Sequence, residues 1–181
     1  MPDAPLLYID VDGVLNPADP YPEDGFRRHE LLGYEVLLSP VHGEWLRELS
    51  GSYELCWATT WQDSANEHLA PLLGLPELPV VGVNRYVRQP GDPRMRLAEL
   101  FSGFKWAPIL RHAAGRPFAW IDDVIPPRLV RNSLLRRDRL LIPVDPHQGL
   151  ERHHVDRLLR RPPTGRRRHW STPGGTRVAW W

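Results

Sequence analysis

Short apolar segments alternate with segments of helical periodicity along most of the chain. Five apolar segments are typical of buried strands, at residues 6–9, 53–58, 79–83, 118–121 and 140–144. Helices are expected at residues 40–50, 63–73, 105–114, 126–135 and 149–160, with a further helical stretch at 94–101. Strands that alternate with helices, through connections too long for hairpins, predict a parallel sheet covered on both faces.

Two polar segments and a tail interrupt this alternation. Residues 17–38 form an expected flap, and the proline-punctuated part at 17–33 is not expected to hold long regular structure. Residues 84–103 are polar, contain glycine and proline, and predict a surface loop. We therefore predict one α/β domain over residues 1–161 and an Arg/Trp-rich tail over residues 162–181.

Length and composition narrow the class of protein. A chain of 181 residues, 41% of them apolar, fits one domain with a hydrophobic core and excludes a disordered polyelectrolyte. Its single cysteine, Cys56, excludes an intramolecular disulfide framework and a cysteine-rich zinc module. No stretch approaches the roughly 18 apolar residues of a membrane span. Without a basic segment ahead of an apolar run at the N-terminus, the expected location is the cytoplasm.

Oxygen-bearing side chains follow three of the expected strands, where ligands collect in open α/β sheets. Several carboxylates at one edge repel one another unless a cation lies among them. Oxygen ligands, with no cysteine cluster, suit Mg²⁺ far better than zinc. The side chains concerned are Asp10 and Asp12, then Thr59 and Thr60, then Asp122 and Asp123.

Four motifs lie at these strand ends and at one helix start. Residues 8–15 read Tyr-Ile-Asp-Val-Asp-Gly-Val-Leu, an apolar strand followed by Asp-x-Asp-Gly-Val. Residues 55–59 form a strand that ends in Thr, with Thr60 as the alternative register. Lys105, the only lysine of the chain, precedes the fourth expected strand. Residues 119–123 form that strand and end in Asp-Asp.

In this order the motifs resemble those of the haloacid dehalogenase (HAD) superfamily of phosphatases, over roughly residues 6–145. The resemblance implies a Rossmann-like three-layer sandwich with a central parallel sheet. It also implies phosphoryl transfer in two steps. Asp10 would attack phosphorus and form an aspartyl-phosphate. Asp12 would protonate the leaving oxygen and then deprotonate the attacking water.

The same resemblance implies how the metal and the phosphate are held. Mg²⁺ would be bound by the Asp10 carboxylate, the backbone carbonyl of Asp12 and the Asp122 carboxylate, with Asp123 in support. The catalytic phosphate contacts would be Thr59, or Thr60 in the alternative register, together with Lys105 and the backbone N–H groups from Gly13 onward. For Asp122 and Asp123 the competing interpretation is a helix N-cap ahead of Pro126 and Pro127.

The spacing of the motifs indicates an open site. Only 48 residues separate Asp10 from Thr59 and 45 separate Thr59 from Lys105, and core elements use most of both. Neither interval has room for a folded cap domain, so the cap is expected to be minimal or absent. An open site with basic residues around its rim suits a nucleotide, a phosphorylated nucleic-acid end or another large partner. Candidate rim residues are Arg27, Arg28, Trp61, Arg85, Tyr86 and Arg88.

Charge is divided unevenly along the chain. Residues 1–100 carry a net charge of −9 and residues 101–181 a net charge of +10. Such a polarised surface is able to attract anions, which allows nucleic-acid binding through the basic half. The predicted function is a Mg²⁺-dependent phosphomonoester hydrolase. The alternatives are a phosphotransferase using the same intermediate, and a HAD-like scaffold that binds nucleic acid or protein with little hydrolytic activity.

Overall fold

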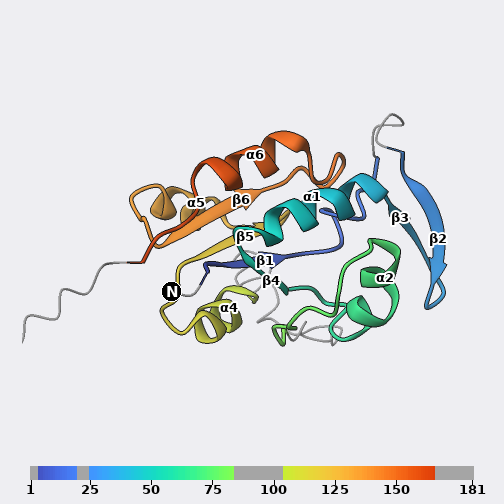
Figure 1. Cartoon of the computed structure of the whole chain (residues 1–181), viewed down its shortest axis with the longest axis horizontal. Coiled ribbons are helices and arrows are strands. Elements are labelled where there is room, and N and C mark those ends of the chain that lie inside the picture. Colours follow the sequence, from blue (N-terminus) through green and yellow to red (C-terminus); the bar gives the residue numbers. More distant parts are fainter. Residues whose placement is uncertain (1–3, 20–24, 84–103, 166–181) are drawn as a thin grey trace, which may run out of the picture.

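The computed structural model describes residues 4–19, 25–83 and 104–165 (Figure 1). The strands are β1 (Leu6–Ile9), β2 (Arg27–Leu31), β3 (Tyr34–Leu38), β4 (Glu54–Trp57), β5 (Phe118–Asp122) and β6 (Arg139–Pro143). The helices are α1 (Pro40–Ser50), the π-helix η2 (Ala65–Leu69), α2 (Ala70–Leu72), α4 (Trp106–Ala113), α5 (Pro127–Ser133) and α6 (Arg152–Arg160). Four strands form a parallel sheet in the order β4-β1-β5-β6, which confirms the predicted α/β class.

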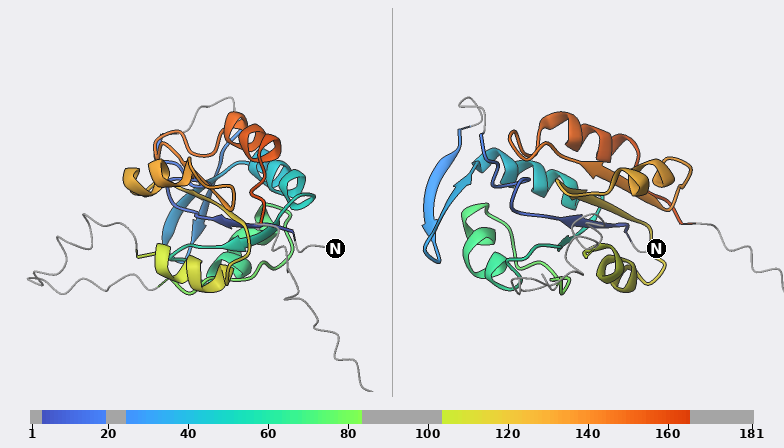
Figure 2. Two further views of the ribbon diagram at one scale, coloured as in Figure 1. Left: turned by 90° about the vertical axis from the view of Figure 1, so that its left-hand side faces the viewer. Right: turned by 180° about the vertical axis from the view of Figure 1, so that it is seen from behind.

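Helices cover both faces of this sheet (Figure 2). Because successive strand residues point to opposite faces, β1 contributes to two separate apolar clusters. Leu7 and Ile9 pack in the cluster that also contains core residues of α1 and α6. Leu6 and Tyr8 pack in the cluster that contains core residues of α4 and is flanked by α5. The expected three-layer arrangement is therefore confirmed.

The start of α1 follows from local sequence. Ser39 is the N-cap, and its hydroxyl accepts a hydrogen bond from the Val41 backbone N–H at 3.2 Å. Pro40 occupies the first helical turn, where its missing N–H costs nothing. At Gly43 an added Cβ would lie 2.1 Å from the Leu73 carbonyl oxygen. Only glycine therefore allows α1 to pack this closely against the end of α2.

The flap contains more regular structure than predicted. β2 and β3 form an antiparallel hairpin within the 17–38 segment, so the expectation of no long regular structure over residues 17–33 was wrong. The strands are joined by Leu32 and Gly33, whose φ angles of 53° and 78° are the two positive values of a tight hairpin turn. The hairpin stands at the end of the molecule toward which β1 runs (Figure 1).

The predicted strand at residues 79–83 was also wrong. Only an isolated bridge joins Val80 to Trp57, so the described sheet has four strands and not five. The Trp57 N–H donates to the Pro79 carbonyl and the Trp57 carbonyl accepts from Val81, both at 2.8 Å, and the pairing ends there. The helix expected at residues 63–73 is present as η2 followed by α2.

Two further predictions concern residues that lie wholly or mostly outside the described segments. The helical stretch predicted at 94–101 and most of the 162–181 tail lie outside them. Within them, no helix has the length and apolar character needed to cross a membrane.

His42 is a buried titratable residue of the core, away from the strand-end carboxylates. Its side chain is fully buried on α1, and its Nε2 donates to the Leu150 carbonyl at 3.0 Å. Burial lowers the pKa of His42 from 6.5 to about 4. The unfolded chain therefore takes up a proton near pH 6.5, whereas the folded chain does so only near pH 4. Stability from the neutral imidazole is complete above pH 6.5 and is lost as the pH falls toward 4.

Between pH 7 and pH 5, the free energy of unfolding of the wild type is therefore expected to fall by about 2 kcal/mol more than that of His42→Gln. Glutamine keeps a donor for the Leu150 carbonyl but does not titrate. Urea unfolding of both proteins at the two pH values measures the difference. Parallel losses in the two proteins would contradict a depressed pKa at His42.

Candidate active site

Two of the predicted carboxylates lie at the carboxyl ends of adjacent strands. β1 ends at Ile9, which pairs in register with Ile121 of β5. Asp10 follows β1 directly, and Asp122 is the last residue of β5. Asp10 is 5% exposed and Asp122 is fully buried. The sheet therefore holds two acidic side chains next to each other, both largely shielded from water.

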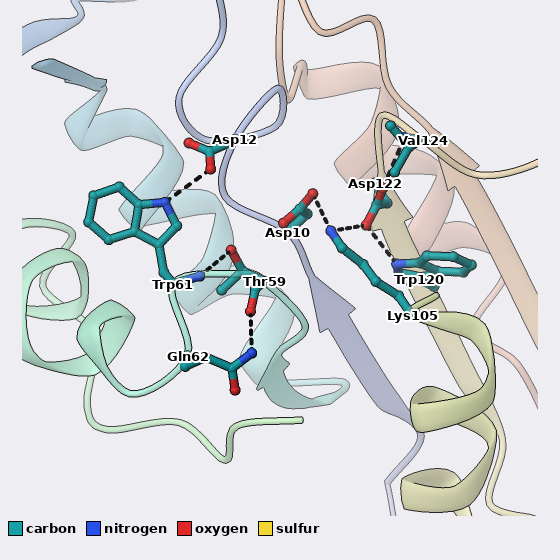
Figure 3. Close-up of polar contacts among 9 residues, drawn as sticks. All are labelled: Asp10, Asp12, Thr59, Trp61, Gln62, Lys105, Trp120, Asp122 and Val124. Atoms are coloured by element: carbon teal, nitrogen blue, oxygen red, sulfur yellow. Dashed lines mark hydrogen bonds and ion pairs between the residues drawn. The ribbon is translucent and has the colours of Figure 1, made fainter. Parts of the chain in front are cut away.

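Lys105 lies between these two carboxylates (Figure 3). It is the residue before α4, and its Nζ lies 2.5 Å from Asp10 Oδ2 and 2.7 Å from Asp122 Oδ2. Burial lowers the pKa of Lys105, but attraction by the two carboxylates outweighs burial, and the net pKa lies above its ordinary value. The only lysine of the chain is thus a buried cation that compensates both acids.

Asp122 is further held by two donors. Trp120 Nε1 donates to Oδ2 at 3.2 Å, and the Val124 backbone N–H donates to Oδ1 at 2.9 Å. Trp120 was predicted only as part of the buried strand at residues 118–121, so its role at the site was missed. The available signal was alternation: residues two apart on a strand share a face, which places Trp120 and Asp122 on the same side.

Three carboxylates form a group that suits a divalent cation. Asp10, Asp122 and Asp123 each offer an oxygen, and these oxygens lie within 4.8 Å of one another. Burial and the neighbouring Asp122 carboxylate raise the pKa of Asp10 above its ordinary value, and Lys105 partly opposes this. Burial and Asp122 also raise the pKa of Asp123. A compact set of oxygen donors whose mutual repulsion a cation relieves fits Mg²⁺.

Asp12 faces away from this group (Figure 3). Its Oδ2 accepts a hydrogen bond from Trp61 Nε1 at 3.1 Å, and its Oδ1 accepts one from Asn16 Nδ2 at 3.1 Å. Asn16 was not predicted as a site residue, and Trp61 was predicted only as a rim contact. The side chains of Asp10 and Asp12 thus point toward different partners, although one residue separates them. The role expected of the Asp12 backbone carbonyl in metal binding stays a prediction.

Gly13 permits the turn that places Asp12. Its φ angle is +74°, a conformation that side chains rarely adopt. An added Cβ would lie 2.7 Å from Cγ and from Oδ2 of Asp123. The glycine of the first motif is therefore required both by the backbone and by the close approach of Asp123.

The two threonines after β4 occupy different environments. Thr59 is fully buried, and its Oγ1 accepts a hydrogen bond from the Trp61 backbone N–H at 3.3 Å. Thr60 is half-buried and lines the cavity beside Asp10. Thr59 is not among the residues that line this cavity, and the choice of phosphate contact between the two threonines stays a prediction.

A cavity of about 510 Å³ opens in front of these groups. Asp10, Asp12, Lys105 and Asp123 contribute to its lining, together with residues of the flap such as Glu35. Among the described rim candidates, Arg27 and Arg28 are exposed on β2 and do not line this cavity. The candidates Arg85, Tyr86 and Arg88 lie outside the described residues.

Most of the chain matches a known protein family. Residues 6–155 match the family described as the HAD domain in Swiss Army Knife RNA repair proteins. The matched segment runs from the start of β1 into α6 and contains every site residue named above. Searches of curated proteins and of solved structures gave no match.

Proposed function

The chain belongs to the family of HAD domains found in Swiss Army Knife RNA repair proteins, and from this premise we propose that it removes terminal phosphate groups from nucleic acids. Membership of the family supports a phosphoester hydrolase or a related activity. The grouping of Asp10, Lys105 and Asp122 at one sheet edge, with Asp12 turned aside, is the observation that carries the proposal. A net charge of +10 over residues 101–181 favours an anionic polymer as substrate.

In the proposed reaction Asp10 and Asp12 have separate tasks. A carboxylate oxygen of Asp10 attacks phosphorus and forms an aspartyl-phosphate, while the bond to the leaving oxygen breaks and that oxygen takes a proton from Asp12. Water then attacks phosphorus and gives a proton to Asp12. The bond between phosphorus and the Asp10 oxygen breaks, which releases phosphate and restores the Asp10 carboxylate. The hydrogen bonds from Trp61 and Asn16 support this division, because they hold Asp12 apart from the nucleophile.

The remaining groups would bind the phosphate and the metal. Asp10, Asp122 and Asp123, with the Asp12 carbonyl, would hold Mg²⁺, as the donor set described above suits this ion. When bound, Mg²⁺ reduces repulsion between the carboxylate and the phosphate. Lys105 would move from neutralising two acids to binding phosphate oxygens. Thr59 or Thr60 and the N–H groups from Gly13 would complete the phosphate site.

Removal of divalent metal is expected to reduce phosphate release from an aryl phosphate by roughly a hundredfold or more, since charge stabilisation by a metal contributes several kcal/mol. The measurement compares the untreated protein, the protein with a chelator, and the chelated protein after Mg²⁺ is returned in excess. Recovery with Mg²⁺ is expected. Equal rates with and without chelator would end the proposal of a metal-dependent phosphatase.

A further inference from the structure

A second cavity adjoins the first on the side of Asp12. It measures about 540 Å³ and shares Asp12, Asn16, Glu35 and Thr60 with the cavity in front of Asp10. Its other walls come from the β2–β3 hairpin and from the segment between β4 and η2. These two parts of the chain lie side by side at one end of the molecule (Figures 1 and 2).

The position of Asp12 assigns a role to this second cavity, if the proposed function holds. A residue that protonates the leaving oxygen must lie within hydrogen-bond reach of it. The Asp12 carboxylate points toward Trp61, which lines the second cavity, and away from Lys105 and Asp122 (Figure 3). The leaving group is therefore expected on the Trp61 side, with the phosphate between the two cavities.

The walls of the second cavity suit a flat, uncharged ring. Tyr34 is 70% exposed and Leu32 is 58% exposed, so both present apolar surface that no described residue covers. The indole of Trp61 is fixed by its hydrogen bond to Asp12. Asp12 and Glu35 line the cavity, Glu35 in an ion pair with Arg28, and none of the described lining residues is cationic. Such a cavity offers no lining cation to a second phosphate and favours a neutral aromatic group.

We propose that this cavity binds the base and sugar of the terminal nucleotide, with the base stacked against Tyr34 and Trp61. Aromatic side chains bind bases of single strands in this way with little sequence preference. The cavity would thereby select nucleic-acid ends over phosphates that lack a base. Trp61 would also position Asp12 through its indole N–H.

The test compares a short oligoadenylate bearing a terminal phosphate with the same strand ending in an abasic sugar, in separate 5′- and 3′-phosphorylated arms. For the wild type, kcat/KM is expected to be roughly tenfold higher for the strand that has the terminal base. Tyr34→Ala is expected to remove most of this preference and Tyr34→Phe to keep it. Leu135→Ala, at a residue that is 92% exposed and lines neither cavity, is the matched control.

Trp61→Phe separates stacking from positioning. It keeps an aromatic ring but removes the N–H that reaches Asp12, so kcat is expected to fall on both strands while the preference for the base remains. An unchanged preference in Tyr34→Ala, or no preference in the wild type, would overturn the subsite. If the wild type releases no phosphate from either strand, the proposed function fails. The subsite is then tested by measuring direct binding of the two strands to the protein. A preference for the strand with the terminal base, lost in Tyr34→Ala, is again expected.

Discussion

Asp10→Asn is expected to reduce phosphate release by roughly a thousandfold or more, because an amide oxygen is a poor nucleophile and forms no stable phosphorylated intermediate. The fold is expected to persist. Asparagine has nearly the shape of aspartate, and its amide oxygen can accept the hydrogen bond from Lys105 Nζ. Initial rates of phosphate release at saturating Mg²⁺ measure the effect.

The control for this change is Glu44→Gln, which makes the same replacement of carboxylate by amide on the exposed side of α1. Glu44 lines neither cavity, and its variant should match the wild type. Unfolding curves for both variants separate a loss of chemistry from a loss of structure. Activity of Asp10→Asn close to that of the wild type would mean that Asp10 is not the nucleophile.

Lys105→Met is expected to lower the free energy of unfolding by about 3–5 kcal/mol in the absence of divalent metal, since it leaves two buried carboxylates without their cation. Addition of Mg²⁺ should restore part of this loss, because a cation that binds only the folded protein stabilises it. Urea unfolding with and without Mg²⁺ measures both effects.

Two further variants test the cause of this loss. Arg152→Met removes a cation from an exposed pair with Glu48, and it should have a much smaller effect because water screens that pair. Lys105→Met combined with Asp10→Asn should have a higher free energy of unfolding than Lys105→Met alone, since only one buried carboxylate is then left without a cation. A Lys105→Met protein as stable as the wild type, with no response to Mg²⁺, would contradict charge compensation at this site.

Local sequence sufficed to locate the strand-end groups. A short apolar run followed at once by acids has few alternatives to a buried strand, and parallel strands bring their carboxyl ends to one edge. Asp10 and Asp122 were therefore predicted together, although 111 residues lie between them in the sequence. Lys105 was predicted from the order of the motifs.

Two features of the fold were predicted wrongly because the sequence patterns did not show how the segments pair. The turn of the β2–β3 hairpin is Leu32-Gly33, and leucine is not a residue that usually indicates a positive φ angle. The run at residues 79–83 is apolar enough for a strand, yet it extends the sheet by one bridge only. In both cases pairing with a neighbouring segment decided the outcome, and composition does not report pairing.

The order of residues is enough to show which groups are available and which strand ends they follow, because short apolar runs must be buried as strands of the sheet. How those groups face one another depends on contacts between parts of the chain that are distant in the sequence. Asp10 turns to Lys105 and Asp122, whereas Asp12 turns to Trp61 and Asn16. Asn16 is a local donor to Asp12, but Trp61 lies 49 residues away along the chain, and no local pattern specifies a donor that distant.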